Sequence, residues 1–402
     1  PGSSQSGRVG ARTEATAAAT LAAARKAGMP TEIAGPTEGP AEGSVQGSVQ
    51  GSGAGVTGAA ARRRRRGAPG LTGLAAEYTR APSEFPRKWI GRMSQDRAPV
   101  KVISEIGCNH KGDMEIAKEL IRVSAHVCKA DIAKFQKRNN RELLTPEEYN
   151  RPHPVPANAY GETYGAHREA LEFDTDQHKD LIECCRENGI AYSTSVWDLT
   201  SAKEMAALNP PLLKIPSATN QHYELQGYLC EHYAGEIHVS TGMSTGDEIA
   251  NLVAFYEERG RAQDLVVYSC TSGYPVAFED ICLFEIRNLM ENFGGRVKGI
   301  GFSGHHLGIA ADVAALAVGR AMEADGKGRF THIERHFTLD RTWKGTDHAA
   351  SLEPDGMRRL CRDLKHVDDA LSYKGQEILP VEQVQRDKLK WVAEKHGAAA
   401  AE

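Results

Sequence analysis

No stretch of this sequence approaches the roughly 18 consecutive apolar residues that a membrane-spanning helix needs. The hydrophobic residues, 40% of the total, are instead spread over short runs between charged segments. This composition is typical of a soluble globular enzyme. We therefore expect a cytoplasmic protein with no membrane partner, while an organelle signal in the first residues stays open.

A cationic excess is also missing, because the 402 residues carry a net charge of −4. Proteins that bind nucleic acid neutralise phosphates with a surplus of positive charge, so nucleic acid is not the expected partner. The one basic run is the five arginines at 62–66. It is interpreted as part of a solvated linker or a targeting remnant, with a nucleic-acid, nuclear-import or membrane-surface patch as the alternative.

The eight cysteines form no CxxC pair and no regular framework. Cys184 and Cys185 are adjacent, which does not suit a disulfide scaffold. We expect reduced thiols in a cytosol-like compartment.

Three regions differ in composition. Residues 1–95 are rich in Ala, Gly, Ser and Pro and contain the direct repeat GSVQGSVQGS at 43–52. Such a segment cannot bury enough apolar surface to compensate for the entropy lost on ordering, so a disordered extension is predicted. Residues 96–375 are predicted to form one catalytic domain, and residues 376–402 a linker-like tail.

From about residue 100, short apolar runs alternate with amphipathic stretches. Eight such strands with crossovers in about 270 residues predict an α/β fold, a (β/α)8 TIM barrel. The long connection at 138–175 is expected to fold over the site. The predicted strands are 101–107, 131–137, 190–196, 211–217, 236–242, 265–270, 297–304 and 331–339, and the predicted helices are 114–129, 176–188, 244–259, 309–324 and 355–371.

Nearly every predicted strand becomes polar at its C-terminal end, although buried parallel strands normally read as continuous apolar runs. The C-terminal face of a barrel is where active sites form. The same placement on all eight strands therefore predicts a catalytic rim. Its members are Glu105, Lys134, Gln136, Thr194, Ser195, Lys214, Ser217, Ser240, Thr241, Thr271, Ser272, Ser303, His305, Glu334 and His336.

Two lysines, Lys134 and Lys214, lie in the apolar contexts IAKF and LLKI. A buried lysine is unfavourable unless an anion meets it. An internal salt bridge with Glu105 or Glu334 is one explanation. The favoured one is a small polyanion with a phosphate and a carboxylate, such as phosphoenolpyruvate. The hydroxyls expected around it belong to Thr194, Ser217 and Ser303.

His305 and His336 end adjacent predicted strands, so their imidazoles can converge. Neutral imidazoles suit first-row metals such as Mn²⁺ or Zn²⁺. The pair has no helical HxxxH spacing, but its position on the rim favours a metal site over two hydrogen-bonded structural histidines.

Several segments together resemble the catalytic barrel of sialic acid synthases, and the eukaryotic branch most of all. The resemblance extends in unbroken order from about residue 100 to 388. The matching segments are SEIGCNHKGD (104–113), AKFQKR (133–138), YGETYGAHREALEF (160–173), LKIPSAT (213–219), STGMS (240–244), CTSGYP (270–275), GFSGHHLG (301–308) and ERHFTLDRTWKGTDHAASLEP (334–354).

This resemblance implies a reaction. C3 of phosphoenolpyruvate attacks the aldehyde of open-chain N-acetylmannosamine, its 6-phosphate or mannose 6-phosphate, to give a sialic acid-type nonulosonate and phosphate. A divalent metal, Mn²⁺ or Mg²⁺, polarises the aldehyde. Water then adds to C2, and phosphate leaves by C–O cleavage.

The resemblance also implies residue roles. Phosphoenolpyruvate would be held by Lys134, Gln136, Thr194, Lys214, Ser217 and Ser303, with Ser272 standing where many bacterial members have Asn. The metal ligands would be His305 and His336. The amino sugar would be positioned by Glu105, Tyr274 and Asp347, and Glu334 would orient the water or the sugar.

Members of this family usually continue into an antifreeze-like domain that lends an arginine to the partner subunit. This sequence reaches the linker-like segment 378–390 and ends soon afterwards, so that domain is expected to be absent. Binding of phosphoenolpyruvate and metal should persist, whereas affinity for an N-acyl sugar and formation of a homodimer stay open.

Three alternatives remain. One is a related synthase that joins phosphoenolpyruvate to an aldose phosphate, which the segment TWKGTDHAASLEP disfavours. Another is a metal-free aldolase in which Lys134 or Lys214 forms a Schiff base. The third is a barrel without catalysis that serves as an assembly subunit.

Overall fold

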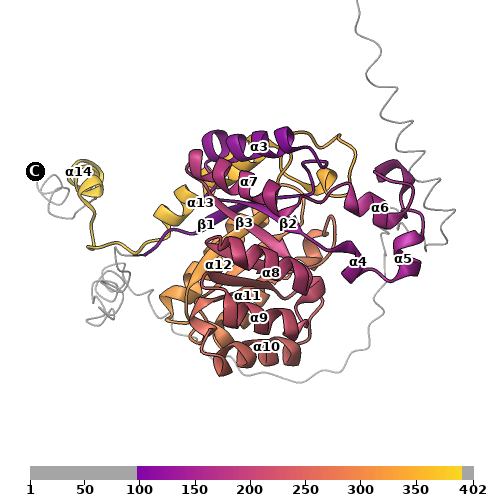
Figure 1. The fold of residues 1–402 in the computed structure, drawn as a ribbon. Coiled ribbons are helices and arrows are strands. Elements are labelled where there is room, and N and C mark those ends of the chain that lie inside the picture. The colour runs from indigo at the N-terminus through magenta and orange to yellow at the C-terminus, as the bar shows by residue number, and fades with distance from the viewer. Residues whose placement is uncertain (1–96, 392–402) are drawn as a thin grey trace, which may run out of the picture. The chain divides into compact units, whose positions relative to one another are not determined.

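The structure is a computed structural model that describes residues 97–391, and eight parallel strands in them close into a barrel (Figure 1). Each strand pairs with its neighbour in sequence, and β8 pairs with β1. The predicted (β/α)8 fold is therefore confirmed. The strands are β1 (Lys101–Gly107), β2 (Ile132–Lys137), β3 (Ala191–Val196), β4 (Leu212–Ile215), β5 (Glu236–Ser240), β6 (Leu265–Cys270), β7 (Gly299–Gly304) and β8 (Phe330–His336).

Strand β4 ends earlier than the sequence suggested, because Pro216 has no N–H to continue the ladder. The other strands begin and end within three residues of the predicted positions.

An apolar layer fills the interior of the barrel, mostly in the first parts of the strands. Its residues form a cluster separate from the larger core between strands and helices. Because alternate residues of a strand point to the same side, the inward positions that follow this layer carry the polar side chains. The interior cluster consists of Ile103, Ile132, Leu212, Val266 and Tyr268.

Helices surround the strands, and the five that periodicity predicted are present. The first of them ends as an α-helix at Arg122 and continues as a π-helix, η2 (Val123–Cys128). Helices α8, α9 and α11 were not predicted; α8 begins where the Asp198 side chain accepts a hydrogen bond from Ser201 N at 2.7 Å. The helices around the barrel are α3 (Met114–Arg122), α7 (Thr175–Glu187), α8 (Leu199–Leu208), α9 (Tyr223–His232), α10 (Gly246–Glu258), α11 (Phe284–Phe293), α12 (Ala310–Ala324) and α13 (Pro354–Ala370).

The connection between β2 and β3, residues 138–174, is called the β2–β3 segment below. It contains α4 (Asn140–Leu143), α5 (Pro146–Asn150) and α6 (Tyr164–Glu169), which Figure 1 shows to one side of the barrel. Gly165 allows α6 to approach α5, since a Cβ there would lie 2.2 Å from the Tyr149 ring. The short turns of 3-10 helix within residues 97–391 are η3 (Pro156–Asn158), η4 (Ser217–Thr219), η5 (Ala262–Asp264), η6 (Phe278–Asp280) and η7 (His348–Ala350).

Helix α14 (Pro380–Leu389) forms inside the stretch interpreted as a linker-like tail. Glu382 accepts the backbone N–H of Leu379 at 2.9 Å, which caps the helix start. The predicted extension at 1–95 and the arginine run at 62–66 lie outside the described residues, as do residues after 391. Among residues 97–391, no helix combines the length and apolar content needed to cross a bilayer.

A buried arginine ties β8 to the start of α12. Arg335 is 1% exposed, and its guanidinium donates to Asp312 Oδ2, to the Gly308 carbonyl at 2.7 Å and to the His306 carbonyl at 2.5 Å. Asp312 is fully buried and also lies 3.2 Å from His306 Nε2. This network fixes the loop that carries His305.

We predict that Asp312→Ala lowers the free energy of unfolding by about 3–5 kcal/mol, because it leaves the Arg335 guanidinium buried and unpaired. Adding Arg335→Met should recover part of that loss. The control is Asp355→Ala on α13, whose carboxylate is 57% exposed and should contribute about 1 kcal/mol at most. Urea unfolding measures both; an equal effect of the two single variants would contradict the prediction.

Candidate active site at the C-terminal end of the barrel

A cavity of about 430 Å³ lies at the C-terminal end of the strands. Its size is in the range of small-molecule sites. Of the residues that the sequence analysis assigned to the donor, the acceptor or the metal, all but one line it: Glu105, Lys134, Gln136, Lys214, Ser217, Ser272, Tyr274, Ser303, His305, Glu334, His336 and Asp347. Two other members of the predicted rim, Thr241 and Thr271, do not line it.

Thr194 is the exception, because it is fully buried and does not line the cavity. Its neighbour Ser195 does line it, and Ser195 Oγ accepts a hydrogen bond from Lys134 Nζ at 2.8 Å. Successive residues of a strand point to opposite sides, so only one of the two can face the barrel interior. We therefore place the β3 hydroxyl of the site at Ser195.

Four charged side chains form a network at the base of the cavity, called the charge cluster below. Lys134 Nζ contacts Glu105 Oε2 and lies 3.7 Å from Glu334 Oε1. Lys214 Nζ donates to the same Glu334 oxygen at 2.6 Å. Each side chain is at most 4% exposed. The salt bridges left open by the sequence are therefore present, and they face the cavity.

Burial and neighbouring charge compete within the charge cluster. Burial alone would raise the pKa of Glu334, but Lys134 and Lys214 outweigh it and hold this pKa well below normal. Burial would lower the pKa of Lys134, yet Glu105 and Glu334 raise it above its usual value. For Lys214 burial prevails, so its pKa is lowered. Glu334 thus stays a carboxylate, and Lys134 stays an ammonium.

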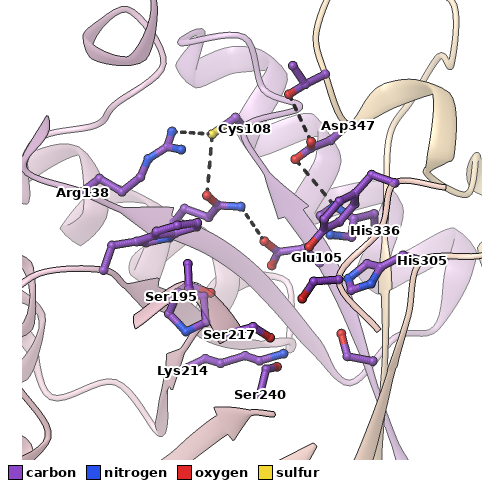
Figure 2. A pocket seen from close by; sticks show the side chains of 18 of the residues that line it. Glu105, Cys108, Arg138, Ser195, Lys214, Ser217, Ser240, His305, His336 and Asp347 are labelled. Carbon is purple, nitrogen blue, oxygen red and sulfur yellow. Dashed lines mark hydrogen bonds and ion pairs between the residues drawn. The ribbon is translucent and has the colours of Figure 1, made fainter. Parts of the chain in front are cut away.

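Three side chains surround Gly242, just after β5, and form what is called the hydroxyl pocket. A Cβ at residue 242 would lie 2.3 Å from Ser272 Oγ, 2.7 Å from Ser217 Oγ and 2.9 Å from Cys270 Sγ. Figure 2 shows Ser217 in the same part of the cavity as Lys214. Hydroxyls beside an ammonium group suit a phosphate.

His305 and His336 come together, as Figure 2 shows. Their ring centroids are 5.4 Å apart. His305 Nδ1 lies 2.9 Å from the Thr271 carbonyl, to which it donates, so Nε2 keeps its lone pair. Burial, followed by the adjacent His336, lowers the pKa of His305 to about 3. His336 Nδ1 is buried without a hydrogen-bond partner, 3.8 Å from Asp347 Oδ2. An imidazole whose Nε2 keeps its lone pair, next to a second imidazole with an unpartnered nitrogen, fits a divalent metal.

A second group with metal-ligating side chains consists of Glu236, His238 and His332. Their ligand atoms lie within 4.8 Å of one another, and His238 Nε2 is 3.2 Å from Glu236 Oε2. They sit on the first parts of β5 and β8, and none lines the cavity. The sequence analysis missed them, because a histidine in mid-strand has no distinguishing spacing.

The β2–β3 segment also reaches the cavity, as expected for this connection. The side chains it contributes were assigned no role from sequence. They are Arg138, His153, Tyr164, His167, Arg168 and Leu171.

Comparison with known proteins identifies the family and several relatives of this chain. Residues 120–376 match the NeuB family. The N-acetylneuraminate-9-phosphate synthases of Mus musculus and Homo sapiens are each 34% identical over 304 residues, covering 76% of this chain and 79% of theirs. The N,N'-diacetyllegionaminic acid synthase of Campylobacter jejuni is 31% identical, covering 67% of this chain and 77% of its own.

A solved structure has the same fold. The N-acetylneuraminic acid synthetase of Leptospira borgpetersenii, crystallised with citrate, superposes with a TM-score of 0.58 at 24% identity. The match covers 73% of this chain and 94% of that one.

We predict that Gly242→Ala weakens binding of phosphoenolpyruvate about 5- to 150-fold, because the added methyl group displaces the Ser217 and Ser272 hydroxyls at an overpacking cost of about 1–3 kcal/mol. The matched control is Gly246→Ala at the start of α10, where a Cβ would meet nothing within 4 Å. Calorimetric titration with phosphoenolpyruvate measures the effect. Equal affinities of the two variants would show that the hydroxyl pocket does not hold the donor.

Proposed function

The chain belongs to the NeuB family, and we propose that it condenses phosphoenolpyruvate with an N-acylhexosamine or hexose acceptor, giving a sialic acid-type nonulosonate and phosphate. One observation carries this proposal: the charge cluster, the hydroxyl pocket and the histidine pair all open into one cavity. We also propose a cytoplasmic location, and formation of a homodimer stays open, as in the sequence analysis.

We assign the donor to the part of the cavity built by the strands. The phosphate of phosphoenolpyruvate would enter the hydroxyl pocket and meet Lys214, and its arrival would favour the charged form of that amine. The carboxylate would lie toward Lys134 and Ser195, which already share a hydrogen bond. Neutral hydroxyls matter here because Glu334 already engages both lysines.

We propose that His305 and His336 hold a divalent cation, Mn²⁺ or Mg²⁺, with Asp347 beside them. The cation would supply a Lewis acid for the aldehyde oxygen of the acceptor. Tyr274 packs over this pair, with its ring centroid 4.4 Å from that of His305, and shields it from solvent.

In the proposed reaction C3 of phosphoenolpyruvate forms a bond to the aldehyde carbon, whose oxygen takes up a proton. Water adds its oxygen to C2. The bond between C2 and the oxygen that bridges it to phosphorus then breaks, and this bridging oxygen leaves as part of the phosphate. Glu105 and Asp347 would orient the acceptor, and Gln136 Nε2 holds Glu105 by a 3.0 Å hydrogen bond. Glu334 has too low a pKa to act as a general acid, so we assign it to holding the two lysines.

A phosphate-release assay across acceptors tests the function. We expect release from phosphoenolpyruvate and Mn²⁺ with N-acetylmannosamine, its 6-phosphate or mannose 6-phosphate, and none with arabinose 5-phosphate. EDTA should stop the reaction. Turnover with the pentose phosphate alone, or full activity in EDTA with borohydride trapping of pyruvate, would refute the assignment.

The metal position is tested by replacing two histidines of β8: His336, from the pair with His305, and His332, from the group with Glu236 and His238. We predict that His336→Gln reduces kcat/KM at least about 100-fold and weakens Mn²⁺ binding, because a ligand is lost. His332→Gln should leave both nearly unchanged, since this residue lies away from the cavity. Mn²⁺ binding is followed by electron paramagnetic resonance and folding by thermal melting. The reverse pattern in folded variants would move the metal to the Glu236 group.

A further inference from the structure

Two histidines and a glutamate lie inside the barrel, away from the cavity, and are called the Glu236 group below. Glu236 and His238 alternate along β5, and His238 pairs with Val266 of the interior apolar layer. His332 lies two residues before Glu334 on β8. Because alternate residues of a strand point to the same side, all three side chains face the barrel interior.

The Glu236 group is unusual for its position, because branched apolar side chains normally fill the interior of such a barrel. His238 is fully buried, and His332 is 3% exposed. Burial lowers the pKa of both histidines, so both rings are neutral. The neutral imidazole is the form that binds a metal ion.

His332 has a ring nitrogen that no group in residues 97–391 uses. The Thr331 hydroxyl donates to the Ile300 carbonyl at 3.4 Å, so its oxygen accepts the Nδ1 proton of His332 over 2.9 Å. The lone pair of the ring is therefore on Nε2, which is buried without a hydrogen-bond partner in this part of the chain. Buried polar atoms are rarely left unpaired, so this nitrogen points to a ligand.

His238 and Glu236 already have the spacing of two metal ligands. His238 Nε2 lies 3.2 Å from Glu236 Oε2, and its Nδ1 lies 2.8 Å from the Tyr268 hydroxyl. Ligand atoms of a tetrahedral zinc site, with bonds of about 2.0–2.1 Å, are about 3.3 Å apart. The ligand atoms of the Glu236 group lie within 4.8 Å of one another, so His332 has to approach by about 1.5 Å at most. The Tyr268 hydroxyl would then accept the Nδ1 proton of His238.

We propose that Glu236, His238 and His332 bind a structural Zn²⁺ ion that cross-links β5 and β8 across the barrel interior. Two imidazoles and one carboxylate, with water in the fourth position, are a known ligand set of zinc. Glu236 begins β5 and its side chain is 26% exposed, so water reaches this side of the group. Strands β5 and β8 are not neighbours in the sheet, and no ladder joins them directly. The zinc site is separate from the ion proposed at His305 and His336.

Two ammonium groups at this end of the barrel oppose cation binding. Lys298 Nζ lies 3.0 Å from Glu236 Oε1, the oxygen that does not face His238, and the charge of Lys101 acts on His332. Lys298→Gln should therefore strengthen zinc binding, by up to about fivefold for a partly exposed ion pair. Weaker binding in this variant would contradict the role of Glu236 as a ligand.

The order of divalent metal affinities separates the two ion sites. Mn²⁺ binds most weakly in this order and Zn²⁺ far more strongly, and imidazole ligands suit zinc. The Glu236 group should therefore select Zn²⁺, and Mn²⁺ resonance should report on His305 and His336 alone.

Zinc titration of the full chain in the His336→Gln background tests the site, because this change removes a ligand of the other ion. After dialysis against EDTA we expect calorimetry to show one Zn²⁺ per chain. Zinc at about 100 times its Kd should raise the melting temperature by about 3–5 °C. Adding His332→Gln or Glu236→Gln should weaken binding at least about 100-fold and abolish the melting shift. Should His332→Gln not fold, Glu236→Gln decides, because its partly exposed amide still reaches His238.

The matched control is His178→Gln on α7 in the same background. His178 is fully buried, its Nδ1 lies 2.6 Å from the Tyr192 hydroxyl, and its Nε2 has no hydrogen-bond partner among the described residues. It belongs to no group of metal-ligating side chains there. Its zinc affinity should equal that of the parent. No zinc binding by the parent, or equal affinities of parent, control and the two ligand variants, overturns the zinc site, whether or not any acceptor is turned over.

Discussion

The site depends on a desolvation constraint: four charges are held out of water inside the barrel, and none of them is tolerable there alone. Lys134, Lys214, Glu105 and Glu334 come from β2, β4, β1 and β8, so they meet only because the sheet closes on itself. Pairing of β8 with β1 brings Glu334 within reach of both lysines. The closed barrel and the charge cluster therefore support each other.

This balance shapes how ligands are recognised at each end of the cavity. A donor anion at the strand ends enters a region whose lysines are already matched by carboxylates, so the neutral hydroxyls packed against Gly242 are important for its binding. His305 beside this region has its pKa lowered by burial, and a neutral imidazole suits metal binding more than anion binding. At the other end of the cavity, Arg168 is half-buried, and its Nε has no hydrogen-bond partner among residues 97–391.

The fold and most of the candidate site could be predicted because two signals coincide: apolar runs of strand length, and polar residues where each run ends. The sequence analysis assigned the donor-binding hydroxyl of β3 to Thr194, whereas Ser195 lines the cavity. Adjacent strand residues point to opposite sides, and the sequence does not determine which of the two faces the barrel interior. Arg168 was missed for another reason. It lies in a connection of three short helices, where no periodicity tells which side chains turn toward the barrel. In the sequence analysis, a salt bridge and an anion site were alternative explanations for the two buried lysines. The structure shows that lysines paired with carboxylates can still face a cavity.

The two ends of the cavity differ in how they are built, and this difference bears on specificity. The donor end consists of strand ends, whose positions are set by the ladder and by packing on both faces. The other end is formed by the β2–β3 segment, which a substitution can alter without disturbing the barrel. An enzyme assembled in this way can keep one donor and change its acceptor. On this argument the acceptor is specified by the least regular part of the barrel, the β2–β3 segment.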